Sequence, residues 1–161
     1  MSDNPHLDRV WDIIERVGVA MLTTHSVGGF RARPVEPRLD RAAGLIWIVT
    51  DLRSGKEHEI EAEHHVGIVC VEAKERAYLS ITARAEVLPD HAKAAEIWRF
   101  TDNLWWKGPD DPTASACHAA DGGIVGRTGQ QGRCGVRVRQ GPAHRRKTEP
   151  GREPQGHCGL G

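Results

Sequence analysis

Aromatic residues and cysteines are scarce in this chain of 161 residues, which has two Phe, one Tyr, five Trp and four Cys. The cysteines form no CxxC pair, which argues against a zinc or redox motif. No apolar run approaches the roughly 20 residues that cross a bilayer. The first residues lack the basic and apolar regions of a signal peptide. We therefore expect one compact domain in the cytoplasm.

The charge balance hides a division of the chain. Lys and Arg number 22, as do Asp and Glu, and this neutral total argues against a protein that coats nucleic acid or an anionic membrane. Residues 1–112 carry a net charge of −5, whereas residues 113–161 carry +5. All eight aromatic residues precede position 107. The sequence thus predicts a folded domain over 1–112 and an irregular, Gly/Arg-rich tail over 113–161.

Hydrophobic periodicity predicts the elements of the first part. Helices are expected over 6–17, 54–63 and 91–100, and strands over 19–24, 30–39, 44–50, 66–71 and 77–83. Glycines at 28 and 29 favour a hairpin turn, and Pro34 and Pro37 mark an edge or bulged strand. Helices that interrupt a meander of short strands indicate an α+β fold with a small barrel.

The stretch from Thr50 to Lys56 carries the most chemistry. It follows the strongest predicted strand and opens a helix, with Ser54 as the candidate N-cap and Glu57 at the capping-box spacing. Two hydroxyls, free helix amides and a lysine could form a phosphate cradle, and Arg33 could reach the same phosphate. A capped helix with solvated charges gives the same pattern and is more common. The glycine array of a Walker loop is missing.

Several segments resemble the pyridoxamine 5′-phosphate oxidase-like flavin proteins, especially their general-stress-protein branch. They are AMLTT at 20–24, RARPV at 31–35, LIWIVT at 45–50 with SGK at 54–56, YLSITARAE at 78–86, and LWWKGPDDP at 104–112. They occur in the family's order over about residues 7–112, which is more specific than any single motif. The resemblance implies a homodimeric FMN-binding split β-barrel with the flavin at the subunit interface.

The resemblance also implies which residues bind the flavin. The phosphate would be held by Arg33, Thr50, Ser54 and Lys56. The backbone near Val35 and Val49 would flank the isoalloxazine ring, and Trp106 would lie near the partner subunit's flavin. Plain packing explains the Trp105–Trp106 pair equally well.

Two departures fall within the matched region. Val35 stands where this branch usually has Met, and Ala83 where it usually has Gly. Both are small apolar changes that a flavin pocket can tolerate.

The function classes stay open at this stage. The resemblance favours an FMN-dependent oxidoreductase, in which the protein orients the flavin and the flavin carries the electrons. A flavin binder without turnover, and a nonfunctional frameshifted product, are the alternatives. FAD and the deazaflavin F420 are alternative cofactors. No convincing acid–base pair is visible, so no catalytic residue is assigned.

Metal binding and nucleic-acid binding have weaker support in the sequence than flavin binding. His25, His58, His64 and His65 lack HExxH-type spacing, so no metal site is expected. Cys70 lies in an apolar strand and is expected in the core. Residues 136–139 are the best candidate for nucleic-acid binding in the basic tail, but the tail has no interleaved aromatic residues for stacking on bases, so nucleic-acid binding is not favoured.

The tail departs from the family, because the expected last strand, WDG-type motif and helix are missing. Back-translation with a one-nucleotide shift permits four family-like segments in order, at residues 118–121, 124–127, 136–140 and 151–158. We therefore expect a single-nucleotide frame change within about residues 113–117. Losing the last strand would leave an open sheet edge and exposed apolar surface, and would weaken folding, dimerisation and flavin retention.

The coding DNA tests the frame change. We expect that a one-base insertion or deletion within codons 113–117 restores the missing strand and helix in the translated product. If no such shift restores them, the hypothesis is wrong.

Overall fold

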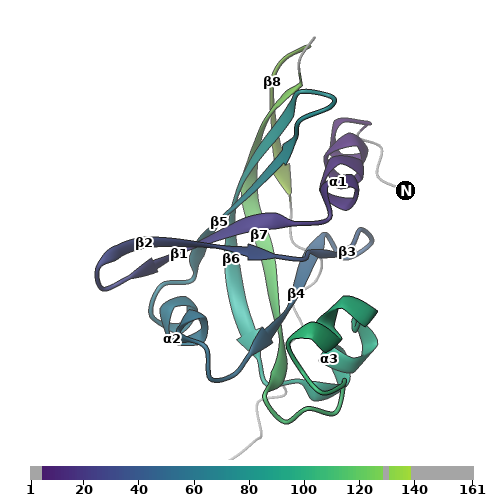
Figure 1. The fold of residues 1–161 in the computed structure, drawn as a ribbon. Helices are drawn as coiled ribbons and strands as arrows, with labels where there is room; N and C mark the ends of the chain where they lie inside the picture. The colour runs from purple at the N-terminus through teal and green to yellow at the C-terminus, as the bar shows by residue number, and fades with distance from the viewer. Residues whose placement is uncertain (1–4, 129–130, 139–161) are drawn as a thin grey trace, which may run out of the picture.

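The computed structural model describes residues 5–128 and 131–138, and their side chains over residues 5–120 (Figure 1). The elements in chain order are α1 (Pro5–Val17), β1 (Ala20–Ser26), β2 (Gly29–Val35), β3 (Arg38–Asp40), β4 (Leu45–Asp51), α2 (Gly55–Ala62), β5 (His65–Glu72), β6 (Ala77–Leu88), α3 (His91–Glu96), a 3-10 turn (Phe100–Leu104), β7 (Ala114–Thr128) and β8 (Gln131–Val138). The helices predicted over 6–17 and 54–63 are confirmed. The helix predicted over 91–100 ends at Glu96.

Helix α1 is amphipathic and packs one face into the main apolar cluster. Its buried residues are Val10, Trp11, Ile13 and Ile14. They recur at the three- and four-residue spacing that places side chains on one helix face. Gly18 follows with a φ of 71°, a left-handed conformation that glycine adopts without a steric penalty, and the helix ends there.

The first two strands form a hairpin that projects from the side of the molecule (Figure 1). Ser26 pairs with Gly29 across a two-residue turn, as the glycines predict. Strand β2 lies at the end of the sheet and pairs only with β1 among the described strands. Pro34 is tolerated there because an edge strand has backbone donors that need no sheet partner.

All described strand pairs are antiparallel, in the order β2-β1-β5-β6-β7-β4-β3, with β8 also paired to β7. The sheet curls around one main apolar cluster and does not close. This is the α+β split-barrel-like arrangement that the sequence predicts. Cys70 lies in this cluster with 1% of its surface exposed, as expected.

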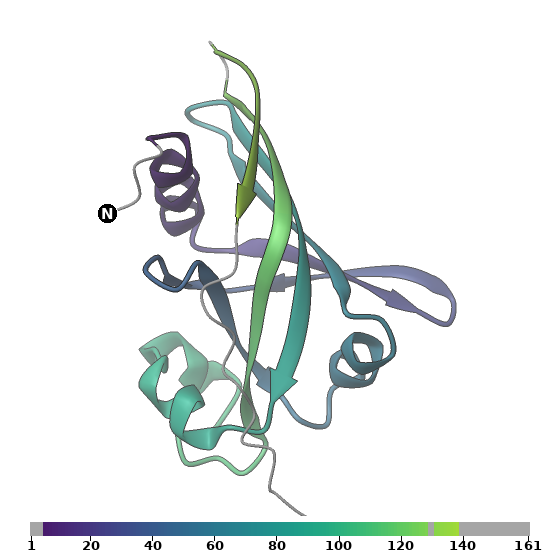
Figure 2. The ribbon, with the colours of Figure 1, turned by 180° about the vertical axis from the view of Figure 1, so that it is seen from behind.

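Strand β7 corrects the prediction of an irregular tail from residue 113. It runs along the length of the sheet beside β6 (Figure 2). On its other side it pairs first with β4, over residues 114–119, and then with β8, over residues 122–128. The open edge expected after residue 112 is therefore filled. The predicted segment at 151–158 lies outside the described residues.

Strand β7 forms because the backbone groups of its two neighbours need hydrogen-bond partners. Strands β4 and β6 both present N–H and C=O groups to the gap between them, and such groups are costly when buried without partners. A chain of small residues satisfies them without an alternating pattern, because a strand covered on both faces needs none. Ala114, Ser115, Ala116 and Cys117 are all buried, at 0–2% exposure.

A buried ion pair fixes the 3-10 turn against the sheet. Arg38 donates from Nη2 to both carboxylate oxygens of Asp102, at 2.7 and 2.8 Å, and both side chains are under 10% exposed. The contact joins β3 to the 3-10 turn. Beside it, α3 packs Ala94 against Trp47 and Ala116 on the outer face of the sheet. No helix in the described part of the chain is long and apolar enough to cross a membrane.

Candidate functional site

Strand β4 delivers Thr50 to the start of the candidate site. Five consecutive residues of β4 are buried, and Thr50 is 1% exposed. Its Oγ1 atom has no hydrogen-bond partner. A buried hydroxyl left unpaired costs about 1–3 kcal/mol, so such groups are rare in native proteins and need an explanation.

Ser54 occupies the N-cap position of α2, but it does not cap the helix. Its side chain makes no cap hydrogen bond, and its Oγ atom is buried without a partner. The predicted capping box with Glu57 is therefore wrong, since Glu57 Oε1 also lacks a partner. The hydroxyls of Ser54 and Thr50 thus both remain available at the junction of β4 and α2.

Lys56 lies in the first turn of α2 and is partly buried. Burial is the main cause that lowers the pKa of its ammonium, and the positive charge of Arg33 acts in the same direction. Among the described residues, Lys56 forms no ion pair. An anion bound here would favour the charged form of Lys56. It would offset the cost of the lost hydration and the repulsion between Lys56 and Arg33.

Arg33 enters the site from β2 and is anchored by α2. It donates from Nη2 to Glu59 Oε2 at 2.8 Å and from Nη1 to Thr24 Oγ1 at 3.2 Å. Thr24 in turn donates to Glu59 Oε2 at 2.6 Å. The hydrogen bond from Thr24, followed by the contacts with Arg33, lowers the pKa of the Glu59 carboxyl.

Three residues of the predicted phosphate cradle lie at one junction of the fold, and the fourth, Arg33, bonds to Glu59 of the helix that follows it. Thr50, Ser54 and Lys56 follow one another at the junction of β4 and α2, and the positive charge of Arg33 adds to the burial that lowers the pKa of Lys56. Two unpaired hydroxyls, one ammonium and one guanidinium are the donor set that binds a phosphate monoester.

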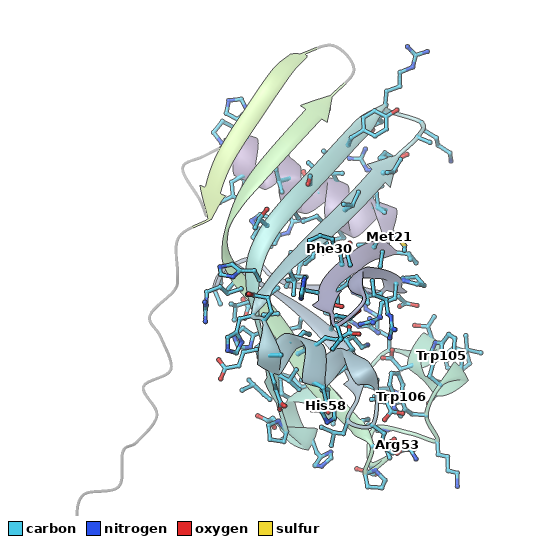
Figure 3. All side chains as sticks on the ribbon, turned by 90° about the vertical axis from the view of Figure 1, so that its left-hand side faces the viewer. Met21, Phe30, Arg53, His58, Trp105 and Trp106 are labelled. Carbon is cyan, nitrogen blue, oxygen red and sulfur yellow. The ribbon has the colours of Figure 1, made fainter. Side chains whose placement is uncertain are left out.

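The other three predicted residues are Val35, Val49 and Trp106. Val35 packs in the main core cluster at 8% exposure, and Val49 is 7% exposed on β4 beside Thr50. Trp106 stacks edge-to-face on Trp98, with ring centroids 5.9 Å apart. The segment after Trp106 is held to the loop before α2, where Leu52 N–H donates to the Thr113 carbonyl at 2.8 Å. Figure 3 shows Trp106 and Arg53 on this side of the molecule.

Sequence reasoning missed several groups beside the cradle. Glu59 and Thr24 join Arg33 only because the β1–β2 hairpin packs against α2, and no local motif signals this. Cys117 is buried near Lys56, and burial raises the pKa of its thiol to about 12. Glu57 is 7% exposed, and burial raises the pKa of its carboxyl.

A separate cavity of about 500 Å³ lies between α1, β3 and α3. It is lined by charged residues of those elements, with Trp47 also in contact. It contains none of the predicted cofactor residues. Most of its charged side chains are already paired, as in Arg41 with Asp12 and Lys93 with Glu96. The unpaired donors of the phosphate cradle are therefore the stronger candidate.

Comparison with known proteins agrees with this fold. The family model described as pyridoxamine 5′-phosphate oxidase like matches residues 5–116. A protein related to general stress protein 26 of B. subtilis, from Clostridium acetobutylicum, superposes with a TM-score of 0.73 at 15% identity, over 85% of this chain and 97% of that one. General stress protein 26 from Bacillus anthracis gives 0.71 at 16%, over 83% and 98%.

A third solved structure is a pyridoxamine 5′-phosphate oxidase-related, FMN-binding protein from Nostoc punctiforme. Its TM-score is 0.61 at 13% identity, over 86% of this chain and 100% of that one. At identities this low, the superpositions show a shared fold and nothing further. Comparison with curated proteins gives no match.

The unpaired Ser54 hydroxyl makes a prediction about stability. Ser54→Ala should raise the free energy of unfolding by about 1–3 kcal/mol, because no cap bond is lost and a buried unpaired hydroxyl is removed. Asp90→Ala is the matched control, since Asp90 caps α3 through a 2.9 Å bond from the Lys93 N–H, and it should cost about 1 kcal/mol. Urea denaturation of the ligand-free protein measures both. An equal loss in the two variants would show that Ser54 does cap its helix.

Proposed function

Because the chain belongs to the pyridoxamine 5′-phosphate oxidase-like family, we propose that it binds FMN and holds the flavin phosphate with Arg33, Thr50, Ser54 and Lys56. The observation that carries the proposal is the pair of buried hydroxyls without partners beside a partly buried lysine, which forms no ion pair with the residues that the structure describes. A phosphate monoester would satisfy all three. The FMN-binding relative from Nostoc punctiforme supports the choice of cofactor.

The proposed role is redox. A bound flavin ring supplies electron-transfer chemistry, and the protein supplies binding, orientation and electrostatics. Lys56 and Arg33 would neutralise the phosphate, while the hydroxyls of Thr50 and Ser54 would orient it. Oxidation of NADH or NADPH by the loaded protein would distinguish an oxidoreductase from a flavin binder without turnover. Titration with FAD and F420 would test the alternative cofactors.

We further propose that the protein is a homodimer. An apolar patch covers the outer face of β1, β5 and β6, and its members are Val19, Met21, Val69, Val71 and Tyr78. They are between 39 and 52% exposed, and the strand register places Met21 beside Val69 and Val71 beside Tyr78. A continuous apolar patch on a sheet face is typical of a protein interface. A second copy of this chain fits the patch, in keeping with the homodimer that the family resemblance implies.

We also keep the frame change as a proposal. The family match ends at residue 116, inside the window of 113–117 in which the sequence predicts the change. The composition changes at the same point, since no aromatic residue follows Trp106. Strand β7 begins at Ala114 and crosses this point, so the phosphate cradle keeps its supporting strand in the chain as written.

Removal of the lysine charge tests the proposed function. Lys56→Met should weaken FMN binding about 10- to 100-fold, which corresponds to losing one charged hydrogen bond. Riboflavin, which lacks the phosphate, should bind the variant and the native protein equally. Fluorescence quenching of each flavin gives both affinities. Lys74→Met removes the same charge from an exposed turn and serves as the control.

Two results would contradict the proposal. One is that the native protein binds neither flavin. The other is that Lys56→Met weakens riboflavin as much as FMN.

The apolar patch makes a prediction about assembly. Val69→Glu places a charge at the centre of the patch and should convert the dimer to a monomer, because burying an unpaired carboxylate is costly. Val27→Glu makes the same change at the exposed hairpin turn, outside the patch, and should leave the dimer intact. Sedimentation velocity measures the change, with far-UV circular dichroism as the check on folding. A native protein that sediments as a monomer would rule out the homodimer.

A further inference from the structure

Arg33 lies on the edge strand β2, where a long side chain has few neighbours to pack against. Strand β2 ends the sheet, and its residues are mostly exposed. Arginine has many rotamers, and ordering its guanidinium on an edge strand is entropically costly. Arg33 is nevertheless only 20% exposed at its side chain, because α2 lies against it. A specific contact therefore orders this side chain before any ligand is present.

Glu59 makes that contact and makes others with it. Its Oε2 accepts from Arg33 Nη2 at 2.8 Å and from Thr24 Oγ1 at 2.6 Å, and its Oε1 lies 3.3 Å from Arg31 Nη1. Arg31 and Arg33 are two residues apart on β2 and share one face of the strand. The Glu59 side chain is only 10% exposed. One carboxylate of α2 thus holds two arginines of the neighbouring hairpin.

We propose that Glu59 is a positioning residue, which orients the Arg33 guanidinium toward the phosphate of the bound flavin. The inference rests on the proposed function, since it assigns Glu59 a role at the same phosphate cradle. Glu59 itself does not touch the ligand. It acts through Arg33, and Thr24 supports it from β1.

The donor count of Arg33 agrees with this role. A guanidinium carries five N–H donors. The bonds to Glu59 and Thr24 use one donor on Nη2 and one on Nη1. Three donors remain, and within the described residues no other acceptor takes them. The contact therefore fixes the plane of the guanidinium without using up the groups that a phosphate needs.

The charge balance agrees as well. Glu59 offsets one of the two charges of Arg31 and Arg33, so the hairpin face keeps one net positive charge. Burial is the main cause of the lowered pKa of Lys56, and the charge of Arg33 acts in the same direction. The cradle therefore stays attractive to a dianion while the hairpin arginines do not repel each other freely.

The experiment compares two carboxylates of the same helix. Glu59→Gln should weaken FMN binding about tenfold, because the charged anchor of Arg33 is lost. It should leave riboflavin binding unchanged. Glu61→Gln removes the same charge from an exposed position of α2 and should change neither affinity. In an Arg33→Met background, Glu59→Gln should have no further effect on FMN.

Thr24→Val serves as the second variant if Glu59→Gln does not fold. It keeps every charge and nearly the same volume but removes the hydroxyl that bridges Arg33 and Glu59. We expect it to weaken FMN about threefold, and riboflavin not at all.

The outcomes separate the inference from the proposed function. If the native protein binds neither flavin, or if Lys56→Met does not discriminate FMN from riboflavin, the phosphate site itself is wrong. If Lys56→Met discriminates them but Glu59→Gln binds FMN unchanged or more tightly, the positioning role alone is wrong. If Glu59→Gln loses the same affinity for FMN and for riboflavin, Glu59 has a structural role only, and the inference is wrong. Equal losses in Glu61→Gln would reduce the effect to long-range charge.

Discussion

The pairing of β7 with both β4 and β6 is the constraint on which the rest of the structure depends. Strand β4 carries Thr50 and leads into α2, yet β3 is its only other partner in the described sheet. Residues 114–119 of β7 join β4 to the long β5–β6 ribbon. They fix the β4 end of the phosphate cradle in the sheet, while the bond from Arg33 to Glu59 ties α2 to the β1–β2 hairpin. The first residues of β7 that form this ladder, Ala114 to Cys117, are small and buried.

A second feature links the fold to its proposed use. Native proteins pair nearly all buried polar groups, yet the hydroxyls of Thr50 and Ser54 are buried without partners within a few residues of each other. Lys56 adds a partly buried cation that has no ion-pair partner in the described part of the chain. Each group lowers the stability of the ligand-free protein, and one anionic ligand would satisfy all of them. The ligand is therefore expected to stabilise the protein as well as bind to it.

Much of this could be predicted from the sequence, and the exceptions have physical causes. Helical spacing locates α1, and the β-branched run locates β4, because both patterns are local. Residues 50–56 could be singled out because a strand end and a helix start lie close together in the chain. The anchoring of Arg33 by Glu59 could not be predicted, because it is a tertiary contact between residues 26 positions apart in the chain. The start of β7 could not be predicted, because Ala114 to Cys117 are small and all buried and therefore show no alternation.

The central claim is that the junction of β4 and α2 is a phosphate site, and a crystal structure with FMN tests it most directly. The account predicts that the flavin phosphate lies within hydrogen-bond distance of Thr50 Oγ1, Ser54 Oγ and Lys56 Nζ, with the Arg33 guanidinium on the same phosphate and still bonded to Glu59. A phosphate bound elsewhere, such as in the cavity between α1, β3 and α3, with both hydroxyls still unpaired, would contradict it.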